Sequence, residues 1–568
     1  MKPEYKKLNS LHCLRLIGNQ NERAAQHGAF LKEIVQKGAI PKLAKKNEFL
    51  IRSSSGAMEN KWLQNSIVLI YKKLLLNYLK KKVPKNYLNS YKKFSEAAQL
   101  PFEIYEEALF QPDGLMLLIR SSSMKYLLGD IQYENTLGCS SVIIPPHLSE
   151  CGRLLSARNL DYPITDFWEK NTTLLFHEPT EKNLIPHCSI TSAGVHTSGV
   201  TAINKEGLTL SLHAHFSSGF NLNGLPITII GEEILTRSKS ISQAIDIAKK
   251  FTPTTNWSII VTSAKEQSGA IIEYTPQKME VRTNDNKILT HTNFYQSEAL
   301  RKTEAILCGA QIDDFENRLC ALNESISKLE KKVEIKDLCE ILGSQLDPSS
   351  NSERVVGNVL GVITTVKSVV FDSENLSFWV SESDSAPAGQ GPYTEIKIEK
   401  FWENFENQTP KQLPGYKPIH SNLREATEFY RRAFQNWHLE FTNSNSKTEA
   451  YENVQKAIAL FPEDGSLMLM GGLIAFKLND FEKSLSFFKK SKNLNSSKHQ
   501  KQVCDLMVAR IHDINGNREQ SLSIYQKFDL VIEPKLRSSY LKGLRHPYQI
   551  SNIAKMTLNL QFPDAIHY

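Results

Sequence analysis

The strongest constraint on the fold is a change of pattern near Gly138, where helical periodicity gives way to short strand-like runs. Turn residues such as Asn204, Gly207 and Gly269 separate these runs. The expected strands are Ser141 to Ile144, Thr173 to Phe176, Ser189 to Ala193, Leu208 to Phe216, Trp257 to Thr262, Ala270 to Tyr274, Val355 to Val370 and Leu376 to Val380. A helix at Ser240 to Phe251, opened by a Ser cap, interrupts them. The pattern predicts an α+β fold in which helices cover sheets.

Helical periodicity dominates both sides of this region. Before Gly138, the stretches Glu22 to Val35, Gln64 to Lys82 and Phe102 to Leu109 predict a helical leader that continues to about Leu128. From Leu423 onward the pattern is helical again. We therefore expect a leader at 1–138, a catalytic domain at 139–400, helical repeats at 423–530 and a C-terminal tail at 531–568.

The C-terminal helices carry a weak internal repeat. Gly472, Ser484 and Phe488 recur 37 residues later as Ala509, Ser521 and Tyr525. This resembles tetratricopeptide repeats, whose usual period is about 34 residues, with an insertion of about three. A groove that binds a protein partner and a merely structural α-helical cap both fit so few repeats.

Positive charge is concentrated in the leader. The chain has 68 Lys and Arg against 61 Asp and Glu, and residues 1–138 hold 22 of the basic and 12 of the acidic side chains. Nine lysines and no acidic residue lie between Asn60 and Ser95, interleaved with apolar residues. A basic amphipathic helix on an anionic membrane and a solvated helix with one core face both fit, and we favour the second because Lys is the default surface residue. No nucleic-acid-binding module or Arg cluster is present, so we expect no nucleic-acid partner.

The cysteines and apolar runs bear on the compartment. The eight cysteines show no CxxC or other metal-binding spacing, which favours a reducing environment. The apolar run from Leu11 to Ile17 contains His12, Cys13 and Arg15 and is too short for a signal peptide. We found no apolar run near the roughly 18 residues of a spanning helix, so we expect a cytoplasmic protein with no transmembrane segment.

Gly138 and Cys139 open the segment with the clearest chemical signal. Alone, a cysteine after a glycine is more often a buried structural thiol. A thiolate nucleophile is favoured by a nearby cation, and Arg158 lies 19 residues on, within reach across a hairpin. Strand parity places Asn159 and Asp161 on one face and Arg158 on the other, unless a bulge intervenes. Spacing alone therefore does not bring both Arg158 and Asp161 to one sulfur.

Several motifs in order resemble a known family. They are Gly18 to Gly28 (GNQNERAAQHG), Gly138 to Ser141, Ala157 to Tyr162 (ARNLDY), Gly199 to Leu208 (GVTAINKEGL), Gly224-Leu225-Pro226, Ser268-Gly269 with Glu273, and Thr292-Asn293. Their order resembles the cysteine N-terminal-nucleophile (Ntn) hydrolases related to the penicillin-forming acyl-CoA acyltransferase (peptidase C45) and, more distantly, to choloylglycine hydrolase and acid ceramidase. The resemblance extends from about residue 18 to residue 395, roughly two-thirds of the chain.

The resemblance implies an αββα sandwich and a precursor that cuts itself between Gly138 and Cys139. The resemblance implies that Cys139 is both the nucleophile and the new N-terminus, that Arg158 lies beside the thiolate, and that Asp161 binds the α-ammonium group of Cys139. A free α-amine has a pKa of roughly 7.7 to 8.0, so it can act as a base without a histidine. Asn293 would donate to the oxyanion, with a second donor near His213 to His215. No cofactor is implied.

The sequence departs from the family at three places that bear on the substrate. Phe294, instead of His, follows Asn293; the acidic residue of the strand turn comes one place late, at Glu206; and the next strand carries His213 and His215. Alternation puts these two histidines on one face, where we expect them to line a substrate pocket rather than to bind zinc.

Three functions fit the sequence. The first is an autoprocessed amidohydrolase or acyltransferase that acts on a small-molecule amide or acyl-CoA thioester through an acyl-enzyme. The second is an interaction protein in which the helical repeats act and the Ntn-like domain is an inactive scaffold. The third is a papain-style Cys/His protease with His213, His215 or His291 as base. We favour the first.

Overall fold

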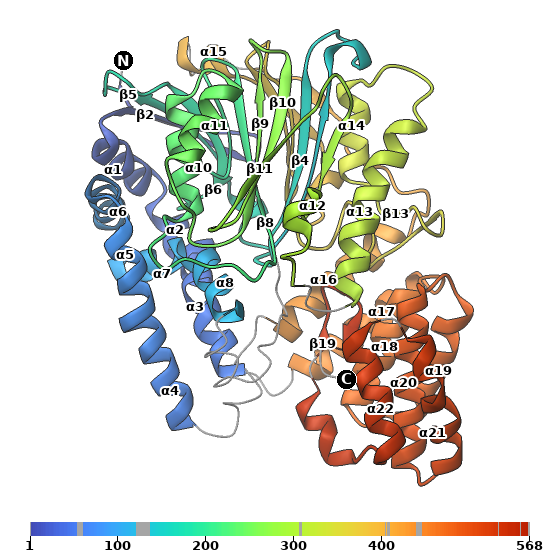
Figure 1. Cartoon of the computed structure of the whole chain (residues 1–568). Helices are drawn as coiled ribbons and strands as arrows, with labels where there is room; N and C mark the ends of the chain where they lie inside the picture. The colour runs from blue at the N-terminus through green and yellow to red at the C-terminus, as the bar shows by residue number, and fades with distance from the viewer. Residues whose placement is uncertain are drawn as a thin grey trace.

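The computed structural model describes residues 2–53, 61–120, 137–305, 309–403, 405, 409–438, 446–531, 533–556 and 558–565. In this part of the chain two large β-sheets face each other, and helices cover their outer faces (Figure 1). Cys308, Asn60 and the end of the predicted leader at Leu128 lie outside the described residues. The predicted α+β fold class is confirmed.

The first sheet has nine strands. Its order is β1 (Glu4–Leu8), β2 (Leu11–Gly18), β5 (Thr172–Pro179), β6 (His187–Ser192), β7 (Thr201–Asn204), β8 (Leu208–Ala214), β9 (Trp257–Ser263), β10 (Ser268–Tyr274) and β11 (Met279–Thr283). All neighbours pair antiparallel except β2 and β5, which run parallel.

The second sheet has seven strands. Its order is β12 (Leu289–His291), β3 (Gly138–Ile144), β4 (Leu155–Asp161), β15 (Thr365–Asp372), β16 (Ser377–Ser381), β17 (Tyr393–Lys397) and β18 (Gln412–Leu413). Gly269 on the first sheet lies so close to the second that a Cβ there would be 2.6 Å from the side chain of Ile143. A small residue at this point lets the two sheets approach each other.

Helices complete four layers. α10 (Ile227–Arg237) and α11 (Ile241–Lys249) contact the first sheet, while α13 (Gly309–Ser327) and α14 (Ile335–Leu342) contact the second. In Figure 1 the two pairs lie on opposite sides of the sheets. Ser240 caps α11 by accepting a hydrogen bond from the Gln243 amide at 3.2 Å, as its sequence predicts. The layers are helix, sheet, sheet and helix.

The leader is helical only after Gly18. Its helices are α1 (Gln20–Phe30), α2 (Lys32–Lys37), α3 (Ala39–Ser53), α4 (Lys61–Ile70), the π-helical turn η1 (Tyr71–Leu76), α5 (Asn77–Lys82), α6 (Lys85–Ala98), α7 (Phe102–Leu109) and α8 (Gln111–Arg120). The first residues instead form β1 and β2, and the apolar run from Leu11 to Ile17 lies inside the sheet between β1 and β5. The leader therefore supplies part of the main sheet.

The predicted strand from Val355 to Val370 is only half correct. Residues 355–364 are buried but form no strand, and β15 begins at Thr365. The Asp464 carboxylate accepts the Val355 amide at 2.7 Å, so a side chain replaces the neighbouring strand. Gly357 and Asn358 both have positive φ, which breaks the extended conformation. Leu376 to Val380 does form a strand, β16.

Consecutive helices pair in the C-terminal region. The elements are α16 (Leu423–His438), α17 (Ser446–Leu460), α18 (Gly465–Lys477), α19 (Phe481–Asn493), α20 (Lys498–Ile514), α21 (Arg518–Tyr525) and α22 (Pro534–Arg545). Each of α16, α18 and α20 packs on the helix that follows it. A Cβ at Gly472 would be 2.5 Å from the Phe488 ring, so the small residue is needed where α18 meets α19. The predicted tail, 531–568, contributes α22, and Phe562 packs against Phe315 of α13.

Candidate active site

Cys139 is the second residue of β3, at the end of the sheet where the leader joins the catalytic layers. Its side chain is 2% exposed. The β3–β4 ladder pairs Gly138 with Asp161, Cys139 with Leu160 and Ser141 with Arg158, in continuous register. Gly138 and Cys139 are joined in this structure, so the Cys139 nitrogen is an amide.

Arg158 reaches the thiol from β4. Its Nη2 is 3.0 Å from Cys139 Sγ, and its Nη1 hydrogen-bonds the Val200 carbonyl at 3.2 Å and the Thr201 hydroxyl. Arg158 lies across from Ser141, two residues from Cys139, so both side chains leave the same face of the ladder. No bulge is needed for this contact.

Asp161 lies on the other face, against the backbone of Gly138. Its Oδ1 accepts a hydrogen bond from the Thr365 hydroxyl at 2.7 Å. Its Oδ2 is buried without a hydrogen bond among the described residues, and the nearest cation is Arg318 at 3.8 Å. A Cβ at Gly138 would be 2.8 Å from this oxygen. The carboxylate therefore faces the Gly138–Cys139 junction rather than the sulfur.

Asn293 follows β12 and contacts the same junction. Its Oδ1 accepts the Cys139 backbone N–H at 2.7 Å, and its Nδ2 donates to the Ala214 carbonyl at 2.9 Å. A side-chain amide has two N–H groups, so one remains for another acceptor. Glu273 fixes the loop after Asn293, because its carboxylate accepts the amides of Gln296 and Ser297 at 2.9 and 3.0 Å.

Arg318, which the sequence analysis did not single out, completes the cluster from α13. Its guanidinium donates to the Cys139 carbonyl at 2.7 Å, to the Ser140 hydroxyl at 2.8 Å and to Asn293 Oδ1 at 3.0 Å. Asp314, one helical turn earlier, holds it through an ion pair at 2.8 Å. The only sequence signal was this i, i+4 pair, which is common on ordinary surface helices. Burial of both partners distinguishes this pair, and burial is visible only in the fold.

Burial and the neighbouring arginines have opposite effects on the pKa values of Cys139 and Asp161. Burial raises the pKa of the Cys139 thiol above its ordinary value, while Arg158 acts to lower it. Burial likewise raises the pKa of Asp161, against the lowering effect of Arg318. Two guanidinium groups therefore stabilise the anionic forms of a buried thiol and a buried carboxylate.

His213 and His215 share one face of β8, as alternation predicts, but neither lines the cavity described below. His213 Nε2 lies 2.7 Å from the Ser141 hydroxyl and its Nδ1 3.2 Å from the Thr292 carbonyl. His215 Nε2 lies 3.2 Å from His291 Nε2, and its ring stacks on Tyr295. Burial lowers the pKa of His215 to about 3. Among the described residues no imidazole hydrogen-bonds Cys139 Sγ.

An apolar cavity lies beside Cys139, on the face of β8 opposite His213 and His215. Leu212 and Ala214 line it, alternating along the strand with the histidines. The remaining wall residues are mostly hydrocarbon and come from the catalytic layers and from the leader: Ile40, Leu43, Ala108, Leu109, Pro112, Leu137, Leu160, Tyr162, Trp168, Val195, Thr197, Val200, Thr228 and Trp257. One wall of the cavity thus belongs to the residues before Cys139. Lys46, one turn after Leu43, places its buried ammonium 5.2 Å from the Tyr162 ring centre.

Other residues of the sequence motifs stabilise the fold and lie in a helix cap, at a helix–helix contact and in a turn. Asn19 caps α1 in a capping box with Glu22, and Gly28 allows α1 to approach α6, because a Cβ there would be 2.5 Å from the Phe94 carbonyl. Gly207 has a φ of +76° in the turn between β7 and β8. Among the described residues no group of three or more His, Cys, Asp or Glu side chains is arranged to hold a metal ion.

Comparison with known proteins gives a match for the middle of the chain. Residues 149–385 match the family described as acyl-coenzyme A:6-aminopenicillanic acid acyl-transferase. No curated protein matches the sequence. The matched segment holds Arg158, Asp161 and Asn293 and begins after Cys139.

Two similar solved structures are of the conjugated bile acid hydrolase from Clostridium perfringens. One, a cysteine-to-alanine mutant, is 12% identical, with a TM-score of 0.29, over 50% of this chain and 99% of that chain. The other, an arginine-to-leucine variant, is 11% identical, with a TM-score of 0.22, over 51% of this chain and 93% of that chain. The family match supports the resemblance to Ntn hydrolases and acyltransferases over the central region of this chain.

Proposed function

We propose that this protein is a cysteine Ntn amidohydrolase or acyltransferase that activates itself by cutting between Gly138 and Cys139. The observation that carries the proposal is the unsatisfied Asp161 Oδ2, buried against Gly138 next to the peptide bond to be cut. A buried carboxylate oxygen without a hydrogen bond is costly in a folded protein. A new α-ammonium on Cys139 would supply the missing partner.

The junction has the groups that self-cleavage needs. Cys139 Sγ would attack the Gly138 carbonyl carbon and form a thioester, while the C–N bond between Gly138 and Cys139 breaks and the Cys139 nitrogen takes up the thiol proton to become an amine. Water would then hydrolyse the thioester, which releases the Gly138 carboxylate and the free Cys139 thiol. Arg158 stabilises the thiolate at 3.0 Å. Asn293 Oδ1 already accepts the Cys139 N–H at 2.7 Å and would keep the same nitrogen in place after it becomes an amine. Arg318 holds the Cys139 carbonyl, which fixes the residue that becomes the new terminus.

The mature site would then act on an external acyl group. The α-amine takes the thiol proton, Cys139 Sγ attacks an amide or thioester carbonyl, and the leaving amine or thiol takes up the proton. Water or a second amine opens the acyl-enzyme. The second N–H of Asn293 is available for the oxyanion.

The cavity favours an apolar acyl group. Its walls are almost entirely hydrocarbon, and Leu160, Leu212 and Trp257 line it together with Cys139. Apolar pockets of this kind gain affinity with each buried methylene, by about 0.8 kcal/mol. We propose N-acyl amides or acyl-CoA thioesters with hydrocarbon acyl chains as substrates, and we expect activity to rise with chain length until the cavity is full.

Intact mass spectrometry tests the processing. We expect pieces of 138 and 430 residues from the parent protein and one chain of 568 residues from Cys139→Ala. Cys320→Ala is the matched control, because this partly exposed thiol lies on the outer helix α13. Processing of Cys139→Ala at the parent rate would refute the proposal. Processed enzyme assayed with N-acyl amides and acyl-CoA thioesters of increasing chain length tests the substrate class.

A further inference from the structure

The leader carries an exposed ridge that alternates apolar and basic side chains. It runs along α4, η1 and α5 and consists of Trp62, Leu69, Ile70, Lys73, Leu74, Tyr78, Lys81 and Lys82. Trp62, Leu69 and Leu74 are 76%, 55% and 66% exposed. Large apolar residues this exposed, grouped on one face, mark an interaction site rather than ordinary surface.

The basic residues of the ridge differ from the lysines behind it. On the inner side, Lys72 forms ion pairs with Glu48 at 2.8 Å and Glu107 at 3.1 Å, and Lys80 pairs with Glu106 at 2.7 Å. Lys73, Lys81 and Lys82 form no ion pair among the described residues. The chain from Asn60 to Ser95 contains no Asp or Glu. The ridge is therefore uniformly positive, and its charge is not neutralised by the protein.

We propose that this ridge docks the protein on an anionic lipid surface. A helix with lysines beside exposed Leu, Ile and Trp matches the physics of interfacial binding, in which apolar side chains enter the acyl boundary and lysines meet anionic headgroups. A second copy of the chain is a poor occupant because two such ridges would bring like charges together. No described helix has the length and hydropathy to cross a bilayer, so the ridge would lie on the surface.

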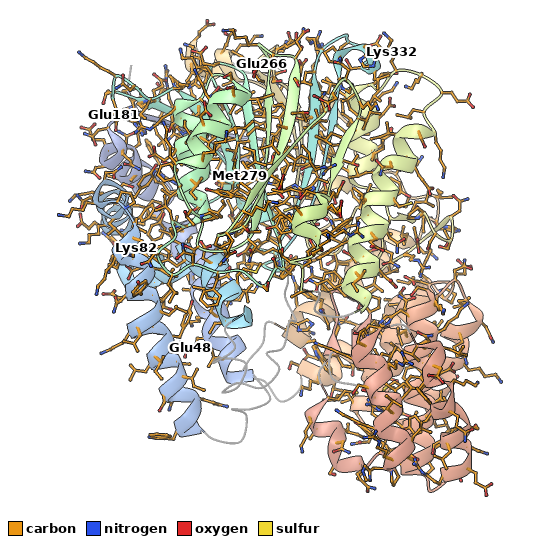
Figure 2. The ribbon with its side chains drawn as sticks, in the orientation of Figure 1. Glu48, Lys82, Glu181, Glu266, Met279 and Lys332 are labelled. Carbon is orange, nitrogen blue, oxygen red and sulfur yellow. The ribbon has the colours of Figure 1, made fainter. Side chains whose placement is uncertain are left out.

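The position of the ridge connects this surface with the apolar cavity. α4 packs on α3, and α3 supplies Ile40 and Leu43 to the cavity wall. In Figure 1, α5 lies at the left of the sandwich and α4 extends below it, with the C-terminal helices at the lower right, and Lys82 lies at the left in Figure 2. When the ridge is bound to a membrane, the apolar cavity would thus lie close to membrane lipids, which carry acyl chains.

Vesicle co-sedimentation of the full-length protein tests the proposal. We expect binding to phosphatidylcholine vesicles that contain about 30% phosphatidylserine, little binding to pure phosphatidylcholine, and weaker binding as salt rises. Replacing Lys73, Lys81 and Lys82 together by Gln should weaken binding about a hundredfold. Leu69→Asp with Leu74→Asp should abolish it, because charges would have to enter the apolar layer.

The matched control is Leu530→Asp with Lys249→Gln, which alters an exposed Leu and an exposed Lys outside the leader and should bind like the parent. Thermal melting of each variant checks folding. Absence of binding by the parent, or parent-like binding by a folded Leu69→Asp, Leu74→Asp variant, would overturn the proposal. Uncut Cys139→Ala should bind the same vesicles, so the test is independent of self-processing.

Discussion

Removing the guanidinium beside the thiol should change the acidity of Cys139 by a measurable amount. Arg158 Nη2 lies 3.0 Å from Cys139 Sγ, and both side chains are buried. Arg158→Met removes the charge and keeps a side chain of similar reach. Because the cation favours the thiolate, its loss should raise the pKa of the thiol.

The size of the effect follows from Coulomb's law. The centre of the guanidinium charge is about 4 Å from the sulfur, which at an effective dielectric constant of about 20 gives about 4 kcal/mol. This free energy corresponds to about a thousandfold change in the equilibrium between thiol and thiolate. Alkylation of Cys139 by iodoacetamide at pH 7 should therefore slow by up to about a thousandfold, since the thiolate is the reactive form.

The assay follows the rate of alkylation of the Cys139 peptide at pH 7 by mass spectrometry, which separates this thiol from the other cysteines. Arg153→Met is the control, because Arg153 pairs with Asp372 at 2.8 Å near the start of β4 and its loss should leave the alkylation rate unchanged. Arg158→Lys keeps a cation and should slow alkylation much less than Arg158→Met. An alkylation rate for folded Arg158→Met within about threefold of the parent rate would show that Arg158 does not stabilise the thiolate.

Three further predictions concern processing, packing and acid stability. Gly138→Val should slow the appearance of the two pieces on a denaturing gel, because a Cβ there would be 2.8 Å from Asp161 Oδ2, and an unchanged rate would contradict this geometry. Gly472→Ala should lower the free energy of unfolding by about 1–3 kcal/mol, measured by denaturant titration, because the Cβ would be 2.5 Å from the Phe488 ring. Because burial lowers the pKa of His215 from 6.5 to about 3, the unfolded state binds a proton more readily than the folded state. The free energy of unfolding is therefore highest above about pH 6.5 and decreases as the pH falls from there towards 3. His215→Phe should therefore remove about 2 kcal/mol of the stability loss between pH 7 and pH 5, and an equal loss in both proteins would refute this.

Local patterns predicted the strands of the catalytic layers well because each combines a short apolar run with flanking turn residues. β3, β8, β9 and β10 lie where these runs were found. β2 was missed because a short apolar run interrupted by Arg15 has no clear alternation. Its pairing with β5, more than 150 residues away, is a long-range contact that no local pattern encodes.

Strand parity correctly predicts that Arg158 and Asp161 lie on opposite faces of β4. It does not predict which atoms each side chain approaches. The register of β3 against β4 puts Arg158 on the face of Cys139 and Asp161 on the face of Gly138. The two residues therefore approach different atoms of one junction. Parity also put His213 and His215 on one face, but a single strand does not show which face lines a cavity. Leu212 and Ala214 line it instead.

The strand β2 has a consequence for how the protein is made. It lies between β1 and β5, in the interior of the largest sheet, and precedes the proposed cut. A severed leader would therefore remain as a subunit in one-to-one stoichiometry, held by the backbone hydrogen bonds that β2 makes with β5 along its length. Folding of the uncut polypeptide is unimolecular, whereas refolding of the two fragments would be bimolecular and its rate would depend on protein concentration. Self-cleavage would therefore make folding effectively irreversible for each molecule.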